Sequence, residues 1–374
     1  MKKRVAVIFG GRSGEHDISI RSAKTVIERI DPAKYEIVPI AISRSGEWLA
    51  PVQSIGLLPE NTCKEFIERF GHPSKNRGLL TGDSSIGGLI AFGDLKGDLP
   101  AIDVIFPVLH GTYGEDGTIQ GLFEMSGLPY VGCGVLASSC GMDKVTMKIL
   151  FRDAGLPICR YVWFLRSEWD KDPDKVIEQT IAKIGLPCFV KPANMGSSVG
   201  ISKASKPEEL RSAIDLAAEY DRKIIVEEAI EMRELECAVI GNDSPEASLP
   251  GEYVILDESK RFLDYTEKYS GTGNNEFVVP APISDELAKR VRQMAVTAFK
   301  AIDGSGLARV DLFLRSDNGA LLMNEINTLP GLTDASGFPK MWAATGKPLP
   351  QLIDEVIELA IERFEDRRRN KTVI

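Results

Sequence analysis

Hydrophobic positions in the first third of the chain alternate between short continuous runs and helical spacing. Residues 5–9 form an unbroken apolar run, which is typical of a buried strand. Between residues 23 and 30, apolar side chains recur at the i, i+3, i+4, i+7 spacing of an amphipathic helix. Further strand-like runs follow at 37–42 and 103–109. This β-α-β order predicts an α/β fold with a parallel sheet and helices on its faces.

The same patterns predict the elements of the remaining chain. Helices are expected at 143–154, 174–184, 207–219, 285–302 and 349–364. Strands are expected at 187–191 and 224–228, followed by a strand pair at 307–315 and 320–327. Residues 51–100 are rich in Gly, Ser and Pro without a clear period, so we expect a loop-rich insertion with one helix near 63–70.

Length and charge limit the possible functions. A chain of 374 residues is too long for one ordinary core and predicts two or three domains. Its 54 acidic and 45 basic residues give a net charge of −9, and no block of five or more like charges occurs. A general nucleic-acid or anionic-membrane role is therefore not expected. Any anion must be bound by a few placed cations.

Composition also points to a compartment. No apolar stretch approaches the roughly 18 residues of a membrane span. The six cysteines form no CxxC pair, so neither a disulfide framework nor a zinc ribbon is indicated. With three histidines, a His-rich metal site is not expected either. The cytoplasm is the expected location.

The strand pair near the C-terminus predicts opposed carboxylates. A three-residue loop, Asp317-Asn318-Gly319, with Gly319 in the left-handed conformation, would pair Ser316 with Ala320. That register sets Asp311 opposite Glu325 and Arg309 opposite Asn327. A two-residue loop would shift the register by one and set Asp311 opposite Ile326, on the wrong face. With the three-residue loop, the following four residues share a face: Leu321, Met323, Glu325 and Asn327.

Two interpretations of these carboxylates stay open at this point. Directly opposed carboxylates repel, and a bound cation would relieve that repulsion. Oxygen ligands of Asp, Glu and Asn suit Mg²⁺ or Mn²⁺ together with phosphate oxygens. Alternatively, Arg309 neutralises Asp311 on a solvated strand face. The strand pattern alone supports both about equally.

Three glycine-rich segments are candidates for ligand binding. Residues 191–200 follow a strand and combine Lys191 with glycines and hydroxyls that can surround an anion, although such a loop is often only a turn. It is not a Walker A loop. Residues 10–16 join the first strand to the first helix, where Glu15 suits either a ligand ammonium group or a helix first turn. His110 lies at the end of a buried strand, where a third glycine loop begins. It is either a histidine at the edge of the core or a binding residue.

A fourth glycine pattern points elsewhere. Residues 132–137 match GxGxxG/A after a strand-like run at 129–131, which would indicate a dinucleotide fingerprint. The signal is weak, because the chain contains 34 glycines and the match lies well past the first strand. A nicotinamide-dependent dehydrogenase is therefore a distant alternative.

Taken together, these motifs resemble the D-alanine–D-alanine ligases of the ATP-grasp superfamily. The resemblance covers essentially the whole chain and runs in the family's order through residues 10–16, 110–117, 142–144, 190–200, 267–269, 308–311 and 324–331. It implies three α/β domains: an N-terminal parallel-sheet, substrate-binding domain at 1–140, a central ATP-grasp domain at 141–233, and a C-terminal ATP-grasp and metal-binding domain at 234–374. ATP would lie between the second and third domains.

The resemblance also implies roles for single residues. For ATP it implies Lys144, Lys191, Ser198, Glu227, Glu234 and Lys268. For two Mg²⁺ or Mn²⁺ ions it implies Asp311, Glu325 and Asn327. As catalytic residues it implies Glu15, Ser197, Tyr269, Arg309 and Ser336. As substrate-binding residues it implies Glu15, His110, Gly331 and Ser336, with Glu15 at the first D-alanine's ammonium and Ser336 at the second substrate's carboxylate.

The implied reaction makes D-alanyl-D-alanine for peptidoglycan, and hence for cell shape, from two D-alanines and ATP through an acyl phosphate. Residues 265–275 would form a lid that excludes water, and a homodimer is expected. Tyr269 disfavours D-lactate, whereas Gly337 stands where relatives usually carry a larger apolar residue and leaves D-serine open.

Three different functions compete with this reaction. They are ligation of D-alanine to D-serine, the reaction of another ATP-grasp carboxylate–amine ligase, and nucleotide binding by a catalytically dead regulator. The presence of Lys191, Asp311 and Glu325 argues against the regulator, because a dead enzyme need not keep them.

Overall fold

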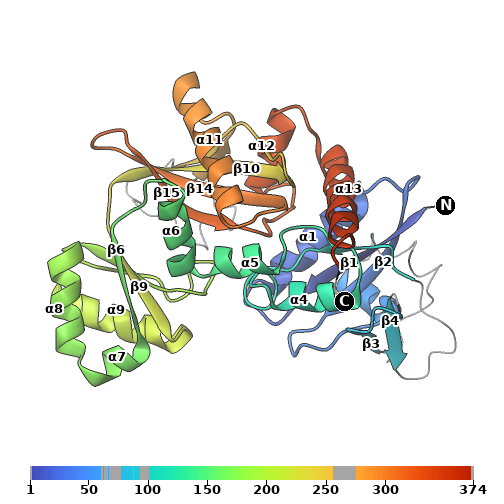
Figure 1. Ribbon diagram of the computed structural model, residues 1–374, viewed down its shortest axis with the longest axis horizontal. Coiled ribbons are helices and arrows are strands. Elements are labelled where there is room, and N and C mark those ends of the chain that lie inside the picture. The colour runs from blue at the N-terminus through green and yellow to red at the C-terminus, as the bar shows by residue number, and fades with distance from the viewer. Residues whose placement is uncertain are drawn as a thin grey trace.

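The strands of this chain form separate sheets that lie side by side rather than one continuous sheet (Figure 1). The computed structural model describes residues 2–59, 62, 66, 77–86, 88–92, 101–255 and 275–371. In these ranges the sheets have three, six, two and four strands. This mixed α/β architecture agrees with the predicted fold class. The domain limits at 140 and 233 stay a prediction.

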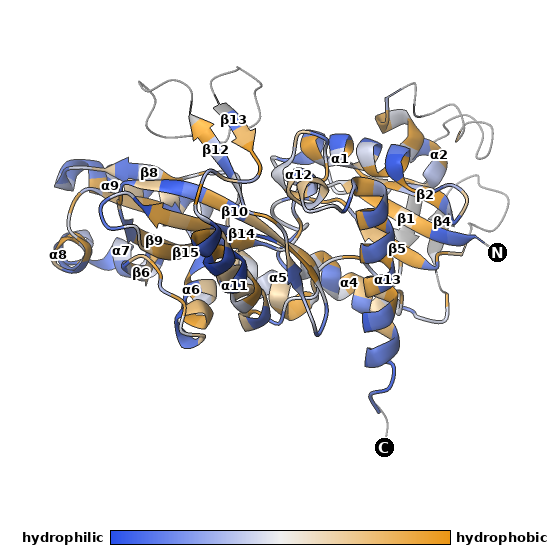
Figure 2. Cartoon of the chain, turned by 90° about the horizontal axis from the view of Figure 1, so that it is seen from above, coloured by the Kyte–Doolittle hydropathy of each residue, from blue (hydrophilic) through white to orange (hydrophobic). Residues whose placement is uncertain are grey.

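The first sheet is parallel, as predicted. Strand β1 (Lys3–Gly10) lies between β2 (Tyr35–Ile42) and β5 (Val104–Pro107). Helix α1 (His16–Arg29) connects β1 to β2 and packs on β1. Residues 5–9 have no exposed surface, because helices cover both faces of the sheet, and β1 and β5 are largely hydrophobic in Figure 2.

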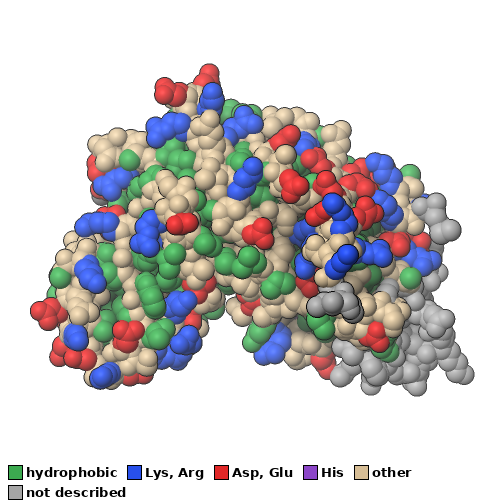
Figure 3. Space-filling model, viewed as in Figure 1, with side chains coloured by type: hydrophobic (Ala, Val, Ile, Leu, Met, Phe, Trp, Pro, Cys, Tyr) green, Lys and Arg blue, Asp and Glu red, His purple; other side chains and the backbone are tan. Residues whose placement is uncertain are grey.

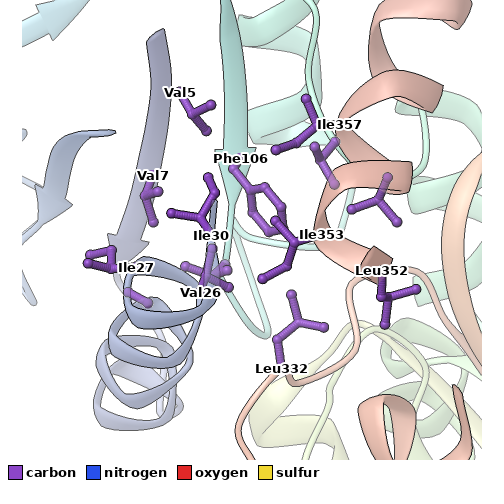
Figure 4. Close-up of a cluster of buried hydrophobic side chains, with 14 of the residues drawn as sticks. Val5, Val7, Val26, Ile27, Ile30, Phe106, Leu332, Leu352, Ile353 and Ile357 are labelled. Carbon is purple, nitrogen blue, oxygen red and sulfur yellow. The ribbon is translucent and has the colours of Figure 1, made fainter. Parts of the chain in front are cut away.

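The core of this first sheet includes a helix from the other end of the sequence. Helix α13 (Leu349–Arg367) contacts β5 and α1. Figure 4 shows Ile353 and Ile357 of α13 next to Phe106 of β5 and Ile30, which follows α1. The two ends of the chain therefore share one hydrophobic core. Beyond this contact, the C-terminal part of α13 is hydrophilic (Figure 2).

The second sheet is antiparallel and has the strand order β6-β9-β7-β8. Its strands are β6 (Tyr161–Leu165), β9 (Lys223–Glu228), β7 (Cys188–Pro192) and β8 (Ser202–Ala204). Helices α7 (Arg166–Lys171), α8 (Pro173–Ile184) and α9 (Pro207–Tyr220) contribute to its core. The prediction missed β6, β8 and α7, which are too short to leave a clear period.

The third sheet carries all three candidate metal ligands. Its order is β13-β12-β10-β14-β15, with β11 paired to β10. The strands are β13 (Asn275–Val278), β12 (Gly251–Ile255), β10 (Met232–Gly241), β11 (Glu246–Ala247), β14 (Gly306–Arg315) and β15 (Leu321–Asn327). Helix α11 (Asp285–Ala301) packs on its apolar face, and α12 (Gly337–Ala344) contacts β10.

The hairpin between β14 and β15 reaches the predicted pairing by a different route. Arg315 N donates to Ala320 O at 2.9 Å, so the loop comprises four residues, 316–319, and the expected pairing of Ser316 with Ala320 is wrong. Gly319 has φ +68°, as predicted. The register then shifts between Asp311 and Leu312, and beyond the shift Asp311 lies opposite Glu325. The expected opposition of these carboxylates is confirmed.

This register shift is a β-bulge that changes which residues share a face. Asn324 and Glu325 together lie opposite Asp311, which is the two-against-one arrangement of a bulge. Leu321 and Met323 lie in the core under α11, whereas Glu325 lies on the other face beside Arg309 in a cavity. The expectation that these residues share a face with Glu325 is therefore wrong, because alternation is interrupted at Asn324.

The segment 51–100 contains more regular structure than expected. Helix α2 (Pro51–Ser54) and the 3₁₀ turn η1 (Ile55–Leu57) open it. Strands β3 (Arg77–Leu80) and β4 (Leu89–Phe92) then pair antiparallel, which the pattern missed because four-residue strands show no reliable alternation. Most of the helix expected near 63–70 lies outside the described residues; Phe66 is helical and buried.

Helices α4 (Thr118–Ser126) and α5 (Val135–Met142) were also missed, and α5 begins inside the GxGxxG match. The glycines there have a packing role. A Cβ atom on Gly306 would lie 3.1 Å from backbone atoms of Gly132, so two backbone segments approach closely at this point. The match therefore needs no dinucleotide to explain it. Among the described residues, no helix is long and apolar enough to cross a membrane.

Candidate active site

The glycine loop after β7 is held by side chains of neighbouring elements. Asn194 N and Nδ2 donate to Asp221 Oδ2 at 2.8 and 2.9 Å. Ser197 and Ser198 have φ values of 54° and 58°, which residues with a Cβ atom rarely adopt. Two strained serines in succession indicate a loop whose conformation serves a ligand.

Helix α6 (Lys144–Asp153) aims a lysine at this loop. Asp143 caps the helix, since its Oδ1 accepts from Val145 N at 3.1 Å and Thr146 N at 2.9 Å. The next residue, Lys144, is 8% exposed, and its Nζ donates to Met195 O at 2.6 Å. Burial lowers the pKa of Lys144. The predicted phosphate lysine thus lies against the predicted phosphate loop.

A first cavity brings together many of the predicted residues, which come from segments in or next to the first, second and third sheets. It is lined by Glu15, Glu115, Gly141, Met142, Lys144, Met195, Gly196, Ser197, Ser198, Arg309, Glu325, Ile326, Asn327 and Thr328. Glu15 precedes α1 and extends toward the two glycine loops. A Cβ atom on Gly111 would lie 2.8 Å from Glu15 Oε2, and one on Gly196 would lie 3.5 Å away. The glycines therefore make room for this carboxylate.

Glu115 is a second carboxyl group in this cavity, and the prediction missed it. Its Oε1 accepts from Gly111 N at 3.0 Å, whereas its buried Oε2 has no hydrogen-bond partner among the described residues. Burial, together with the negative charge of Glu15, raises the pKa of Glu115 to about 8. Glu115 is therefore largely protonated at neutral pH and can donate a hydrogen bond into the cavity.

A row of carboxylates crosses the third sheet. Glu236 of β10, Asp311 of β14 and Glu325 of β15 lie directly opposite one another. Arg309 donates to both oxygens of Asp311, at 2.7 and 2.6 Å, and its Nε lies 3.5 Å from Glu236 Oε2. Asp311 is 1% exposed, and burial raises its pKa to about 7 although Arg309 opposes the shift.

This donor set fits a hard divalent cation only together with other oxygens. Asp311, Glu325 and Asn327 offer carboxylate and amide oxygens, which suit Mg²⁺ or Mn²⁺. Within the described ranges, no three His, Cys, Asp or Glu side chains are grouped to hold a metal by themselves. Water and phosphate oxygens would have to complete the coordination. Arg309 neutralises Asp311, as the second interpretation expected, but in a buried rather than a solvated setting. The metal interpretation stays a prediction.

A second cavity adjoins the first at Ser198 and Glu325, which line both. Lys191, Glu227 and Glu234 also line it, as do Phe189, Ile201, Ile230, Met232 and Phe313. Lys191 Nζ donates to Glu227 Oε2 at 3.0 Å. Burial opposes the ionisation of Glu227, but Lys148 and Lys191 outweigh it and lower the pKa to about 2. An apolar lining that includes a few charged groups suits a nucleotide.

Four of the predicted residues that the structure describes lie outside the linings of these two cavities: His110, Asp311, Gly331 and Ser336. His110 is 6% exposed; its Nδ1 donates to Leu329 O at 3.1 Å, and its Nε2 lies 3.3 Å from Ser22 Oγ. Ser336 Oγ accepts from Thr333 N at 3.2 Å, and a Cβ atom on Gly331 would lie 2.9 Å from it. Lys268 and Tyr269, and the lid expected at 265–275 apart from its last residue, lie outside the described residues.

Gly337 does not leave the open space that its size suggests. A Cβ atom at this position would lie 2.7 Å from Glu236 Oε2 and 2.7 Å from Phe277 Cζ. The volume that a larger side chain would fill is thus taken by these two neighbours. A wider second-substrate pocket at Gly337 is not supported.

Comparisons with known proteins identify the family of this chain. A family model described as D-ala D-ala ligase N-terminus matches residues 4–133, and one described as D-ala D-ala ligase C-terminus matches residues 150–358. The chain belongs to the D-alanine–D-alanine ligase family. A D-alanine–D-alanine ligase of Ruminiclostridium cellulolyticum is 48% identical, over 99% of this chain and 98% of its own.

Solved structures of the same family share this fold. The VanG D-Ala:D-Ser ligase of Enterococcus faecalis superposes with a TM-score of 0.82 at 36% identity, covering 96% of this chain and 100% of its own. The D-alanine–D-alanine ligase of Coxiella burnetii gives a TM-score of 0.80 at 34% identity, covering 98% of both chains. Family membership therefore extends over the whole chain.

Several site residues escaped the sequence analysis although signals for them existed. Glu115 lies within the 110–117 motif, Glu236 alternates with Glu234 along β10, and Lys148 follows Lys144 by one helical turn. Spacing shows that such residues share a face. Spacing does not show whether that face is buried, and the burial of these charged residues is what makes them unusual.

Proposed function

We propose that this chain joins two D-alanines in an ATP-dependent reaction that yields D-alanyl-D-alanine, ADP and phosphate. The main support is that relatives named D-alanine–D-alanine ligase match the chain over nearly its full length. The first cavity adds support, because Glu15, Lys144 and Arg309 line it together. The product would serve peptidoglycan synthesis. A homodimer and a cytoplasmic location remain part of this proposal, as do domain limits near 140 and 233.

The proposed chemistry divides between the two cavities. The second cavity would hold the nucleotide, with Lys191 and Lys144 at its phosphates and Glu234 at the ribose. Two Mg²⁺ or Mn²⁺ ions would be held by Asp311, Glu325 and Asn327. Their positive charge would offset the negative charge of the transferring phosphoryl group. Ser198 and Glu325 lie where the cavities meet, and we place the phosphoryl transfer there.

The first cavity would bind the amino acids. Glu15 would pair with the ammonium of the first D-alanine, whose carboxylate attacks the γ-phosphate and gives an acyl phosphate and ADP. The amine of the second D-alanine, after losing a proton, would attack the acyl carbon, and phosphate would leave. Arg309 would stabilise the oxyanion formed in that step. Ser197, Tyr269, His110, Gly331 and Ser336 keep their predicted substrate roles, and Lys268 its predicted phosphate contact.

The reaction is tested by measuring ADP and phosphate release from ATP with Mg²⁺ and D-alanine, D-serine or D-lactate, with products identified by mass spectrometry. We expect D-alanine alone to support turnover and to give the dipeptide. D-serine together with D-alanine tests the second candidate, because the VanG D-Ala:D-Ser ligase shares the fold. If no D-amino or D-hydroxy acid stimulates ADP release, the proposal fails.

The metal assignment is tested at Glu325. Glu325→Gln removes a carboxylate without changing its volume, so we expect turnover to fall by at least about 100-fold. Mn²⁺ binding, followed by electron paramagnetic resonance with a non-hydrolysable ATP analogue, should weaken in parallel. Glu246→Gln, an exposed position of the same sheet, is the control and should change neither quantity. Full activity of Glu325→Gln would refute the assignment.

A further inference from the structure

Lys148 is a buried lysine that no substrate in either cavity would touch. Its side chain is 1% exposed, and it lines neither cavity. It lies on α6, one turn after Lys144. Its Nζ is 3.2 Å from Glu227 Oε1 and donates to Asn324 O at 3.3 Å. An ammonium group is costly to bury unless it is paired. Its placement therefore needs a reason beyond packing.

Two lysines share the single carboxylate of Glu227, one on each oxygen. Lys191 Nζ donates to Oε2 at 3.0 Å, and Lys148 Nζ lies beside Oε1. The two differ in access: the Lys191 side chain is 12% exposed and lines the second cavity, whereas Lys148 is behind its wall. Only Lys191 can leave Glu227 for a ligand in that cavity.

ATP would draw Lys191 away from Glu227. If Lys191 pairs with the phosphates, as the proposed function requires, Glu227 loses its bond at Oε2. Glu227 is 2% exposed, so without a second cation it would become an unpaired buried charge. Lys148 keeps one cation on Glu227 in both situations. The second lysine thus removes the penalty that nucleotide binding would otherwise carry.

We propose that Lys148 is a positioning residue that holds the charge of Glu227 while Lys191 turns to the phosphates of ATP. This inference rests on the proposed nucleotide role of the second cavity. The second contact of Lys148, to Asn324, is consistent with this role. Asn324 is the bulge residue beside Glu325, so the same ammonium group joins Glu227 of β9 to the strand that carries a predicted metal ligand.

The proposal is tested by nucleotide affinity in single and double variants. Lys148→Met keeps the side-chain length but removes the charge. We expect the Kd of ADP and of a non-hydrolysable ATP analogue, measured by calorimetry, to rise at least about tenfold. The KM of ATP should rise in parallel, while the KM of D-alanine stays within about twofold. Arg152→Met, an exposed cation on the same helix, is the control and should leave these constants unchanged.

A double-variant cycle separates this role from a merely structural one. In Glu227→Gln no carboxylate needs a cation, so adding Lys148→Met should change the ADP affinity by no more than about twofold. The double variant Glu227→Gln/Lys148→Met lacks both charges. Comparing it with Glu227→Gln therefore does not require that the single variant Lys148→Met folds. Lys148→Arg should restore most of the affinity. A wild-type Kd in folded Lys148→Met, or equal losses in both backgrounds, would overturn the proposal.

The outcome is distinguishable from failure of the proposed reaction. Calorimetry reports nucleotide binding without D-alanine, so it tests Lys148 even if D-alanine does not stimulate ADP release. Conversely, normal ligation by the wild type together with unchanged affinity in Lys148→Met would support the reaction and reject the role of Lys148.

Discussion

Buried acids give this site its chemical character at the scale of single residues. Glu115 and Asp311 both have pKa values raised by burial, to about 8 and about 7, and each also lies near other carboxylates. Burying a charged carboxylate without a partner is costly for a fold. Perturbed acids in a cavity are typical of functional sites, and they also make measurable predictions about pH.

The pKa of Glu115 predicts how stability changes with pH. The pKa of Glu115 in the folded chain, about 8, lies above the ordinary value of 4.5. Between pH 4.5 and pH 8, the folded state therefore holds a proton that the unfolded chain has lost. The contribution of Glu115 to the stability of the folded state is fully present below pH 4.5 and is lost as the pH rises through 8. Relative to Glu115→Gln, the unfolding free energy of the wild type should therefore fall by at most about 1.4 kcal/mol per pH unit in this window.

Urea denaturation at pH 5, 6.5 and 8 measures this difference, with Glu246→Gln as the exposed control. Because Glu15, Arg309 and Glu325 also act on Glu115, the slope reports the whole group of charges. Parallel stability profiles for the wild type and Glu115→Gln would contradict the raised pKa.

Gly337 allows a second prediction at this scale. Glu236 and Phe277 occupy the space beside it, so Gly337→Leu forces a displacement and should lower the unfolding free energy by about 1–3 kcal/mol. Gly121→Ala is the control, because its Cβ atom would meet no neighbour and α4 gains a better helix former. An equally stable Gly337→Leu would mean that Phe277 or Glu236 moves freely.

At the scale of elements, helix starts and strand register determine the site. Asp143 caps α6 and also contacts the glycine loop. The second contact joins Asp143 Oδ2 to Asn194 Nδ2, which lies 3.4 Å away. The Asn324 bulge sets Glu325 opposite Asp311. Each feature is local in sequence, yet its effect is to align groups from different elements.

Removing the cap of α6 should affect both stability and nucleotide binding. Asp143→Ala loses two backbone contacts and should destabilise the protein by about 0.5–2 kcal/mol. It should also weaken ADP binding, because Lys144 and the glycine loop lose a fixed neighbour. Ser284→Ala removes the comparable cap of α11 and should lower stability alone. Equal ADP affinities in the two variants would contradict this link.

The sequence predicted elements with strong periodicity and failed where context decides. α1, α11 and β1 were found because burial imposes a repeating pattern on them. The opposition of Asp311 and Glu325 was found although the turn was wrong, since the four-residue loop and the bulge compensate each other. A bulge leaves no signal in a single sequence. The burial of Lys148 and Glu236 was likewise invisible, because it depends on neighbouring sheets.

At the scale of the whole molecule, one core is built from both ends of the chain. Leu352, Ile353, Val356 and Ile357 of α13 complete the core of the first sheet, whereas the cluster around the second sheet contains only residues between 162 and 226. Charged side chains of both signs are spread over the face shown in Figure 3.

This arrangement predicts different behaviour for two fragments. Each buried aliphatic side chain of α13 contributes about 2 kcal/mol, so losing four of them removes an amount comparable to the stability of a domain. A fragment of residues 1–140 should therefore show no cooperative thermal unfolding by circular dichroism, whereas residues 141–233 should. Linking residues 345–371 to the first fragment should restore a transition. Cooperative unfolding of residues 1–140 alone would contradict this expectation.

The position of α13 also has a consequence for biosynthesis. A ribosome adding roughly 5–20 residues per second completes β5 well before it reaches α13, so the first sheet waits for its covering helix for about 10–50 s. During this time the apolar side of Phe106 and its neighbours stays open to other nascent chains. We expect newly made protein to depend on chaperones chiefly in this interval, and truncated translation products to aggregate through their N-terminal part.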